Sequence, residues 1–196
     1  MVRGRAVLEL GAGAGLPSLV AGLLGAARVV VTDFPDPDLV ANLHANVDAC
    51  AAWFPGHHTE AHPVVVPAGF VWGADARPLL ALLPPPAAGP PGFDVLVLAD
   101  LLFRHAEHGK LVKTVRETLA RRRGAVALVV FSSYRPWLRH KDLAFFDAAR
   151  DAGLATEKLF DRIMPRPLFE HDPGDEEVRK TVSAWAVRWP AEACED

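Results

Sequence analysis

The residues with the clearest chemical meaning lie between Val7 and Gly15, where the sequence reads VLELGAGAG. A hydrophobic run containing Glu9 leads into a turn with alternate glycines, and Asp33 ends a second hydrophobic run 18 residues after Gly15. Such a turn between a strand and a helix lets a ligand approach the backbone, and a carboxylate ending the next strand can bond ribose hydroxyls. The combination predicts a site for an adenosine-containing cofactor; a tight turn without a ligand is the alternative.

The spacing of the glycines favours S-adenosylmethionine over a dinucleotide. The dinucleotide pattern G-x-G-x-x-G needs a third glycine for close helix packing, and this chain has Leu16 at that position. Glu9, two residues before Gly11, would repel a pyrophosphate but can hold the cationic amino-acid group of S-adenosylmethionine. The turn also lacks the G-K-[S/T] ending of a phosphate-binding P-loop.

Bulk properties narrow the class of protein further. The 196 residues suit one domain, and a hydrophobic content of 51% excludes general disorder. Apolar runs such as 126–131 are far shorter than the roughly 20 residues that span a bilayer. Cys50 and Cys194 form neither a disulfide framework nor a metal-ligand pattern, which favours a reducing, cytosolic compartment. A net charge of −3 without a basic cluster argues against nucleic-acid binding, and we expect a monomer.

Strand-like and helix-like segments alternate along the chain, which predicts an α/β fold around a mainly parallel sheet with helices on both faces. We expect seven strands, at residues 6–10, 28–33, within 64–72, 93–100, 125–132, 155–163 and 179–189. Helices are expected at 16–26, 36–50, 75–83, 107–122 and 141–152, with loops at 51–61 and 84–92. Because a long acidic loop rather than a helix joins the last two strands, the last strand should be antiparallel.

Two groups of histidines are candidate metal ligands. His57, His58 and His62 lie close to Glu60, but in a loop without regular ligand spacing, so we interpret them as surface residues. His105 and His108 are expected near the active edge as structural or substrate-contacting groups. We therefore predict no metal site, and no Ser/His/Asp nucleophile arrangement is visible in the sequence.

Four stretches, residues 7–21, 29–46, 71–75 and 94–110, resemble the class I S-adenosylmethionine-dependent methyltransferases, in the branch that modifies lysines and protein N-termini. The resemblance implies cofactor contacts at Gly11, Ala12 and Gly13, at Asp33 for the ribose, at Trp72 against the adenine, and at Ala99; Glu9 joins this set from the residue argument above. Asp75 is an alternative partner for the adenine amino group. Asp100-Leu-Leu-Phe103 matches the D-x-x-[Y/F] signature that follows the fourth strand in this branch.

The same resemblance implies a protein substrate. This chain is similar to fungal members that methylate the amino-terminal glycine and adjacent lysine of translation elongation factor 1-alpha. Relatives carry a segment ahead of the glycine strand that closes over the cofactor; this chain begins six residues before Val7, so we expect one methyltransferase domain, 1–196, without that lid. A nicotinamide-dependent oxidoreductase, a non-catalytic methyltransferase-fold partner, and a methyltransferase of another protein lysine or of a small amine such as nicotinamide remain as alternatives.

Methyl transfer to nitrogen is an in-line displacement, so the protein mainly aligns a neutral amine and excludes water. An N-terminal amine with a pKa of about 7.7 is about one-sixth neutral at pH 7, whereas a lysine at about 10.4 is neutral in about one part in 2,500. We expect Asp100 to orient the amine through a charge-assisted hydrogen bond and Phe103 to shape the pocket.

Overall fold

A computed structural model describes residues 1–54, 64–85 and 89–194. Within them, seven strands form one sheet in the order β3-β2-β1-β4-β5-β7-β6. The strands are β1 (Ala6–Leu10), β2 (Arg28–Asp33), β3 (Val65–Gly69), β4 (Val95–Ala99), β5 (Val126–Ser132), β6 (Ala155–Ile163) and β7 (Thr181–Arg188). β7 pairs antiparallel with both β5 and β6, and the pairs among β1 to β5 are parallel. The expected fold class is confirmed.

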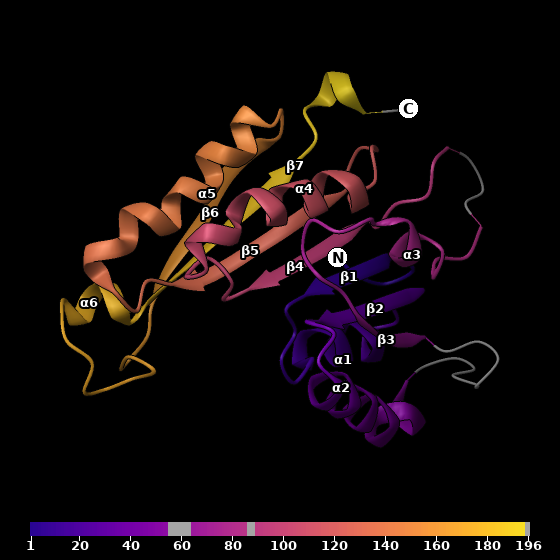
Figure 1. The fold of residues 1–196 in the computed structure, drawn as a ribbon, viewed down its shortest axis with the longest axis horizontal. Helices are drawn as coiled ribbons and strands as arrows, with labels where there is room; N and C mark the ends of the chain where they lie inside the picture. The colour runs from indigo at the N-terminus through magenta and orange to yellow at the C-terminus, as the bar shows by residue number, and fades with distance from the viewer. Residues whose placement is uncertain (55–63, 86–88, 195–196) are drawn as a thin grey trace.

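Helices cover both faces of the sheet (Figure 1). Alternation along β1 separates the two cores: Val7 packs with residues of α1 (Leu16–Leu23) and α2 (Pro37–Cys50). Leu8 and Leu10 belong to a larger core on the other face, with residues of α3, α4 and α5. The remaining helical segments are α3 (Arg77–Leu80), α4 (His108–Thr118), α5 (Arg139–Asp151), α6 (Glu176–Arg179), and the short η1 (Ala51–Trp53), η2 (His105–Glu107), η3 (Pro136–Leu138) and η4 (Ala191–Ala193).

Strand order creates a switch point beside β1. From β1 the chain adds β2 and β3 on one side, then crosses to place β4 and β5 on the other side. Connections that leave neighbouring strands in opposite directions open a crevice at the carboxyl ends of those strands, where ligands bind in open α/β sheets. The glycine turn after β1 and the residues after β4 flank this point.

α1, α3 and α4 each end three or four residues earlier than the sequence predicts. α1 ends at Leu23 rather than at residue 26, and Gly25 takes a φ of 84° immediately after it. α3 is a single turn rather than residues 75–83, because hydrogen bonds after Leu80 shift to i→i−3 spacing ahead of Pro84. On α2, Leu43 and Val47 face the core, whereas Leu39 is 39% exposed.

α4 stops at Thr118 instead of residue 122 because the chain turns into a bridge with the start of β4. Phe93 N–H donates to Thr118 O at 2.8 Å, and Ala120 N–H donates to Phe93 O at 2.9 Å. The approach is close enough to require Gly92, where a β-carbon would lie 2.7 Å from Ala120 Cα. The arginines at 121–123 therefore follow this bridge and are not at a helix end.

Part of the sequence-based interpretation lies outside the described residues. His57, His58, Glu60 and His62 belong to the interval 55–63, and the connector 84–92 contains the interval 86–88. No helix within the described ranges is long and apolar enough to cross a membrane.

The N-terminus of α2 offers a test of the fold. The Asp36 carboxylate accepts hydrogen bonds from Asp38 N–H at 2.9 Å and Leu39 N–H at 3.4 Å. Replacing Asp36 with alanine removes this cap and should lower the free energy of unfolding by about 1 kcal/mol in urea titrations. Asp36→Asn keeps an acceptor oxygen and should retain most of that free energy; equal losses in the two variants would contradict the assignment.

Candidate active site

The turn after β1 presents backbone to the crevice. Gly11, Gly13 and Gly15 have φ values of 61°, 57° and 76°, a left-handed conformation that side chains with a β-carbon rarely adopt. The turn is tied to β2, because Ala12 N–H donates to Thr32 O at 2.9 Å and Gly13 N–H donates to Asp33 Oδ2 at 2.6 Å. Asp33 thus lies beside the turn, and its carboxylate orders it.

Glu9 occupies a different position from the one expected. Strand alternation turns its side chain toward α1, where it is 1% exposed. Its carboxylate accepts hydrogen bonds from both Ser18 N–H and Ser18 Oγ. Burial is the main cause that raises the Glu9 pKa to about 7. The structure therefore places Glu9 in the junction between β1 and α1, not as an open carboxylate for a cationic group.

Trp72 lies against the glycine turn. A β-carbon added to Gly11 would lie 2.9 Å from Trp72 Cζ2 and 2.7 Å from Leu101 Cδ2, whereas one at Gly13 would meet open space. Leu101 and the Trp72 indole therefore pack so closely on Gly11 that only glycine fits at this position. The backbone at Gly73 is held by α4, because Gly73 N–H donates to Thr114 Oγ1 at 2.8 Å.

Asp75, the other residue considered for an adenine, is committed elsewhere. It pairs with Arg77, with Arg77 Nη2 2.6 Å from Asp75 Oδ2, and hydrogen bonds from Arg77 are the main cause that lowers the Asp75 pKa to about 2. Both residues line a groove of about 640 Å³ between α3 and the end of α4, and that groove contains neither the glycine turn nor the residues after β4. The geometry thus favours Trp72.

Asp100 follows Ala99 at the carboxyl end of β4 and has a φ of 60°, which makes it the one non-glycine residue with positive φ in the described chain. Its backbone N–H donates to Val130 O at 2.7 Å, which extends the β4–β5 pairing by one residue. Burial is the main cause that raises the Asp100 pKa. A carboxylate held in a strained backbone at a ligand-binding edge is a mark of a functional residue.

Phe103 ends the D-x-x-F segment and is 47% exposed, while Leu101 and Leu102 are buried beneath it. Two contacts hold this segment from outside: Arg135 Nη2 donates to Phe103 O at 3.2 Å, and His108 Nε2 lies 2.8 Å from Leu102 O. Burial lowers the His108 pKa, so its neutral form is favoured and donates to that carbonyl. The exposed ring is thus presented by a fixed backbone.

Sequence reasoning missed a network centred on Asp142 of α5. His105 Nε2 lies 2.7 Å from Asp142 Oδ1, and Ser133 Oγ donates to Asp142 Oδ2 at 2.7 Å. The aspartate stands between the serine and the histidine, so the group cannot activate the serine as a nucleophile, for which the histidine must be central. These hydrogen bonds join η2, the end of β5 and α5. This contact is consistent with the structural role expected for His105.

Tyr134 is the second residue that the sequence did not reveal. Its hydroxyl donates to Asp100 Oδ2 at 2.9 Å across 34 residues of sequence. The available signal was weak: Tyr134 is the single tyrosine of the chain and lies just beyond a predicted strand.

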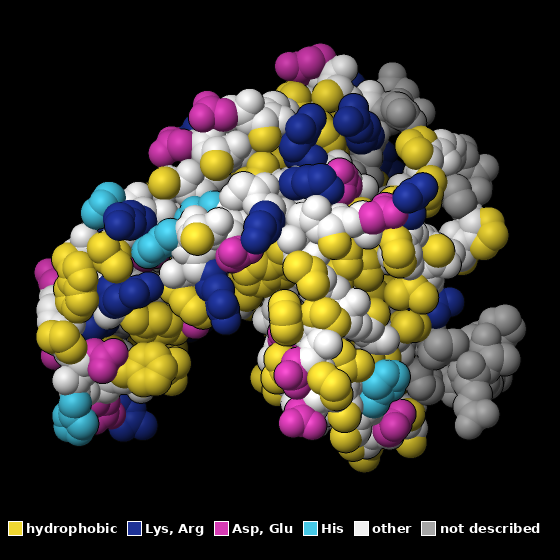
Figure 2. Space-filling model, viewed as in Figure 1, with side chains coloured by type: hydrophobic (Ala, Val, Ile, Leu, Met, Phe, Trp, Pro, Cys, Tyr) yellow, Lys and Arg dark blue, Asp and Glu magenta, His cyan; other side chains and the backbone are white. Residues whose placement is uncertain are grey.

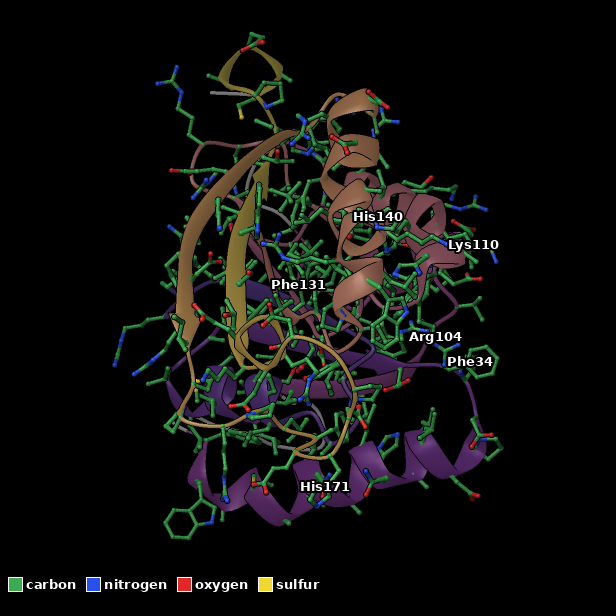
Figure 3. All side chains as sticks on the ribbon, turned by 90° about the vertical axis from the view of Figure 1, so that its left-hand side faces the viewer. Phe34, Arg104, Lys110, Phe131, His140 and His171 are labelled. Carbon is green, nitrogen blue, oxygen red and sulfur yellow. The ribbon has the colours of Figure 1, made fainter. Side chains whose placement is uncertain are left out.

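The site opens into a hollow of the molecular surface. Figure 2 shows this hollow between the side formed by α1 and α2 and the side formed by α6 and the β6–β7 connection. In Figure 3, Phe34, which follows β2, and Arg104, which follows β4, project on the same side of the molecule. No group of three or more His, Cys, Asp or Glu side chains within residues 1–54, 64–85 and 89–194 is placed to hold a metal ion.

The raised pKa of Glu9 predicts a pH-dependent stability. Above the unfolded value of 4.5 and up to about 7, the folded chain binds more protons at Glu9 than the unfolded chain, so stability from this group is lost as pH rises. Glu9→Gln keeps an acceptor for Ser18 but cannot ionise. Relative to wild type, the free energy of unfolding of this variant should rise by about 3 kcal/mol between pH 4.5 and pH 8.

Urea unfolding of both proteins at the two pH values measures this difference. Glu157→Gln, which changes an exposed glutamate on β6, is the control and should show no such gain. An unchanged pH dependence in Glu9→Gln would contradict the assignment.

Comparisons with known proteins give matches over most of the chain. A family model described as lysine methyltransferase matches residues 1–152. The chain is 55% identical over 191 residues to protein N-terminal and lysine N-methyltransferase efm7 of Neurospora crassa, covering 97% of this chain and 67% of that protein. It is 54% identical over 198 residues to the protein of the same name from Gibberella zeae, covering 98% of this chain and 73% of that protein.

Solved structures share the fold at low sequence identity. An S-adenosylmethionine-dependent methyltransferase of Streptococcus mutans gives a TM-score of 0.62 at 16% identity, covering 95% of this chain and 45% of that one. Another methyltransferase, bound to S-adenosylhomocysteine, gives 0.62 at 14% identity, covering 95% and 46%. From the family match and the close relatives, the chain belongs to the lysine methyltransferase family and is an S-adenosylmethionine-dependent N-methyltransferase.

Proposed function

We propose that this chain transfers methyl groups to the N-terminal α-amine, the adjacent lysine, or both, of translation elongation factor 1-alpha. The observation that carries the proposal is the pairing of β1 with β4. This pairing brings the glycine turn and the carboxylate of Asp100 to the same switch point. The names of the relatives from Neurospora crassa and Gibberella zeae, which refer to protein N-termini and lysines, support a protein amine as acceptor.

The proposed cofactor seat consists of the glycine turn and the strand ends beside it. Gly11, Ala12 and Gly13 form the turn, with open space beside Gly13, and Trp72 next to Gly11 offers an indole surface for a purine. Asp33 has its carboxylate beside the turn for ribose hydroxyls, and Ala99 ends β4 next to it. We assign Glu9 an indirect role, because its bonds to Ser18 hold α1 against β1.

S-adenosylmethionine, when bound, supplies a methyl group on a sulfonium sulfur. Asp100 accepts a hydrogen bond from the acceptor amine and thereby aims the nitrogen lone pair at that methyl carbon. Phe103 covers one side of the amine and excludes water. Transfer forms the nitrogen–carbon bond, breaks the carbon–sulfur bond, and leaves an ammonium proton that solvent removes before the next transfer.

The protonation state of Asp100 matters because an ionised carboxylate accepts the amine N–H more strongly than the protonated acid does. Burial raises its pKa, and the hydrogen bond from Tyr134 opposes that rise. An α-amine needs little help to be neutral near pH 7, whereas a lysine must lose far more of its charge on entering the cleft. The α-amine is therefore the easier acceptor for this site.

The proposal places the reaction on a monomer in the cytosol, with one methyltransferase domain over residues 1–196. Both cysteines, Cys50 and Cys194, are free thiols in the structure, in keeping with a reducing compartment. The described sheet is continuous from β3 to β6, in keeping with one domain.

Mass spectrometry of the N-terminal peptide tests the acceptor. Recombinant elongation factor 1-alpha incubated with the enzyme and labelled S-adenosylmethionine should gain methyl groups at the α-amine or adjacent lysine. Asp100→Asn, which tolerates the left-handed backbone, should lower the rate about a hundredfold while S-adenosylhomocysteine still binds.

Two controls sharpen that experiment. An acetylated N-terminus should remove labelling of the α-amine and leave any labelling of lysine. Methylation of nicotinamide in place of the protein would contradict the acceptor, and an unimpaired Asp100→Asn enzyme would remove Asp100 from the reaction.

Gly11→Ala tests the proposed cofactor seat. The new methyl group would crowd Trp72 and Leu101 at a φ of 61°, so the affinity for S-adenosylhomocysteine should fall at least about tenfold in calorimetry. Gly4→Ala is a matched control, because Gly4 has a φ of 69° but no neighbour within 4 Å of an added β-carbon. The Gly4→Ala variant should keep its affinity for S-adenosylhomocysteine. Equal losses of affinity in the two variants would contradict the proposed cofactor-binding site.

A further inference from the structure

We propose that Tyr134 is a positioning residue for methyl transfer, which orients the Asp100 carboxylate and is itself held by Phe169 of the β6–β7 connection. The inference rests on the proposed role of Asp100 and extends it to a segment far away in sequence. The connection between β6 and β7, residues 164–180, would then set the geometry of the acceptor amine without touching it.

The Asp100 carboxylate needs an external restraint. The backbone is fixed by the hydrogen bond from Asp100 N–H to Val130 O, whereas the orientation of the carboxylate depends on its own hydrogen bonds, to the Ser132 backbone and to Tyr134. Tyr134 O–H donates to Oδ2 at 2.9 Å, and the carboxylate, with its several lone pairs, keeps acceptor capacity for an amine N–H. The hydroxyl therefore selects one orientation of the carboxylate.

The tyrosine hydroxyl is a dependable donor at this place. Burial is the main cause that raises the Tyr134 pKa, and the charge of Asp100 raises it further, so the phenol stays protonated. The Tyr134 ring is half-buried, and the Phe169 ring meets it edge to face, with centroids 5.3 Å apart and planes at 74°. Phe169 thus restricts rotation of the tyrosine.

Phe169 is anchored in turn by two contacts of its own connection. Phe169 O accepts a hydrogen bond from Arg179 Nη1 at 2.7 Å, and Arg179 is 6% exposed at the end of α6. Gly174 packs on η3, since a β-carbon there would lie 3.1 Å from Pro136 Cδ. Figure 3 shows this connection, which carries the labelled His171, below the ends of β6 and β7. The order of contacts is therefore Arg179, Phe169, Tyr134 and Asp100.

The charged groups around Asp100 come from three elements. Asp142 of α5 raises the Asp100 pKa, and Asp142 is itself paired with His105 of η2. The hydrogen bond from Tyr134, which follows β5, acts in the opposite direction. Removing the hydroxyl leaves only the backbone hydrogen bond of Ser132 to oppose burial and Asp142, so Asp100 protonates at higher pH.

Tyr134→Phe provides the direct test, because it removes the hydroxyl and keeps the ring on Phe169. We expect kcat to fall about tenfold, with KM for the protein acceptor and the affinity for S-adenosylhomocysteine within about twofold of wild type. The acid limb of the pH–rate profile should move to higher pH. Titration of the substrate amine affects both enzymes equally, so the difference between them reports Asp100.

Phe169→Ala tests the outer contact. It should lower kcat in the same direction by a smaller factor, and it should add little to Tyr134→Phe in the double variant, because both act through one carboxylate. Phe160→Ala removes an equally exposed phenylalanine from β6, 53% against 51%, and should leave kcat unchanged. Additive losses, or equal effects of Phe169→Ala and Phe160→Ala, would overturn the contribution of the connection.

The Asp100→Asn variant distinguishes failure of this inference from failure of the proposed role of Asp100. An inactive Asp100→Asn enzyme together with a Tyr134→Phe enzyme whose kcat and pH profile match wild type would overturn the positioning role alone. An active Asp100→Asn enzyme would overturn the role of Asp100 itself, and with it the inference. Both variants are compared only when S-adenosylhomocysteine raises their Tm as it raises that of wild type.

Discussion

The rest of the structure depends on the crossing of the chain from β3 to β4, which places β4 beside β1. Parallel strands buried on both faces must all end at one edge, and connections leaving β1 and β4 in opposite directions cannot fill the space between them. The crevice is therefore a product of topology before any polar side chain is considered. Its walls are backbone on one side, at Gly11, and a carboxylate on the other, at Asp100.

Unfavourable backbone conformations and buried carboxyl groups are concentrated at this edge. The glycine turn and Asp100 share left-handed backbone, and Glu9 is a carboxylate almost without exposure. Such features persist only where the surroundings over-determine them. Here the surroundings are the hydrophobic strands on both sides, together with the Asp142 network that links η2, β5 and α5. The packing of the sheet thus offsets the free-energy cost of the left-handed backbone and the buried carboxyl group at this edge.

Much of this arrangement could be predicted from the sequence, because short apolar runs bounded by glycine and aspartate mark strands and their ends. The ranges 6–10, 28–33 and 155–163 agree with the structure, as does the antiparallel β7. The ends of α3 and α4 could not be predicted, since a proline segment and the bridge of Phe93 with Leu119 decide them. The bond between Tyr134 and Asp100 joins residues 34 apart, and no local pattern encodes such a distance.

The antiparallel strand β7 has a consequence for how the enzyme can diverge. Because β7 starts at the edge where β5 and β6 end, the connection that leads into it lies at the carboxyl edge of the parallel strands. Residues 164–180 carry few buried side chains, among them Arg179, so their length and sequence are weakly constrained by the core. Insertions or deletions there would leave every strand pairing intact. The sheet that carries the glycine turn and Asp100 can thus stay unchanged while the length of this connection varies.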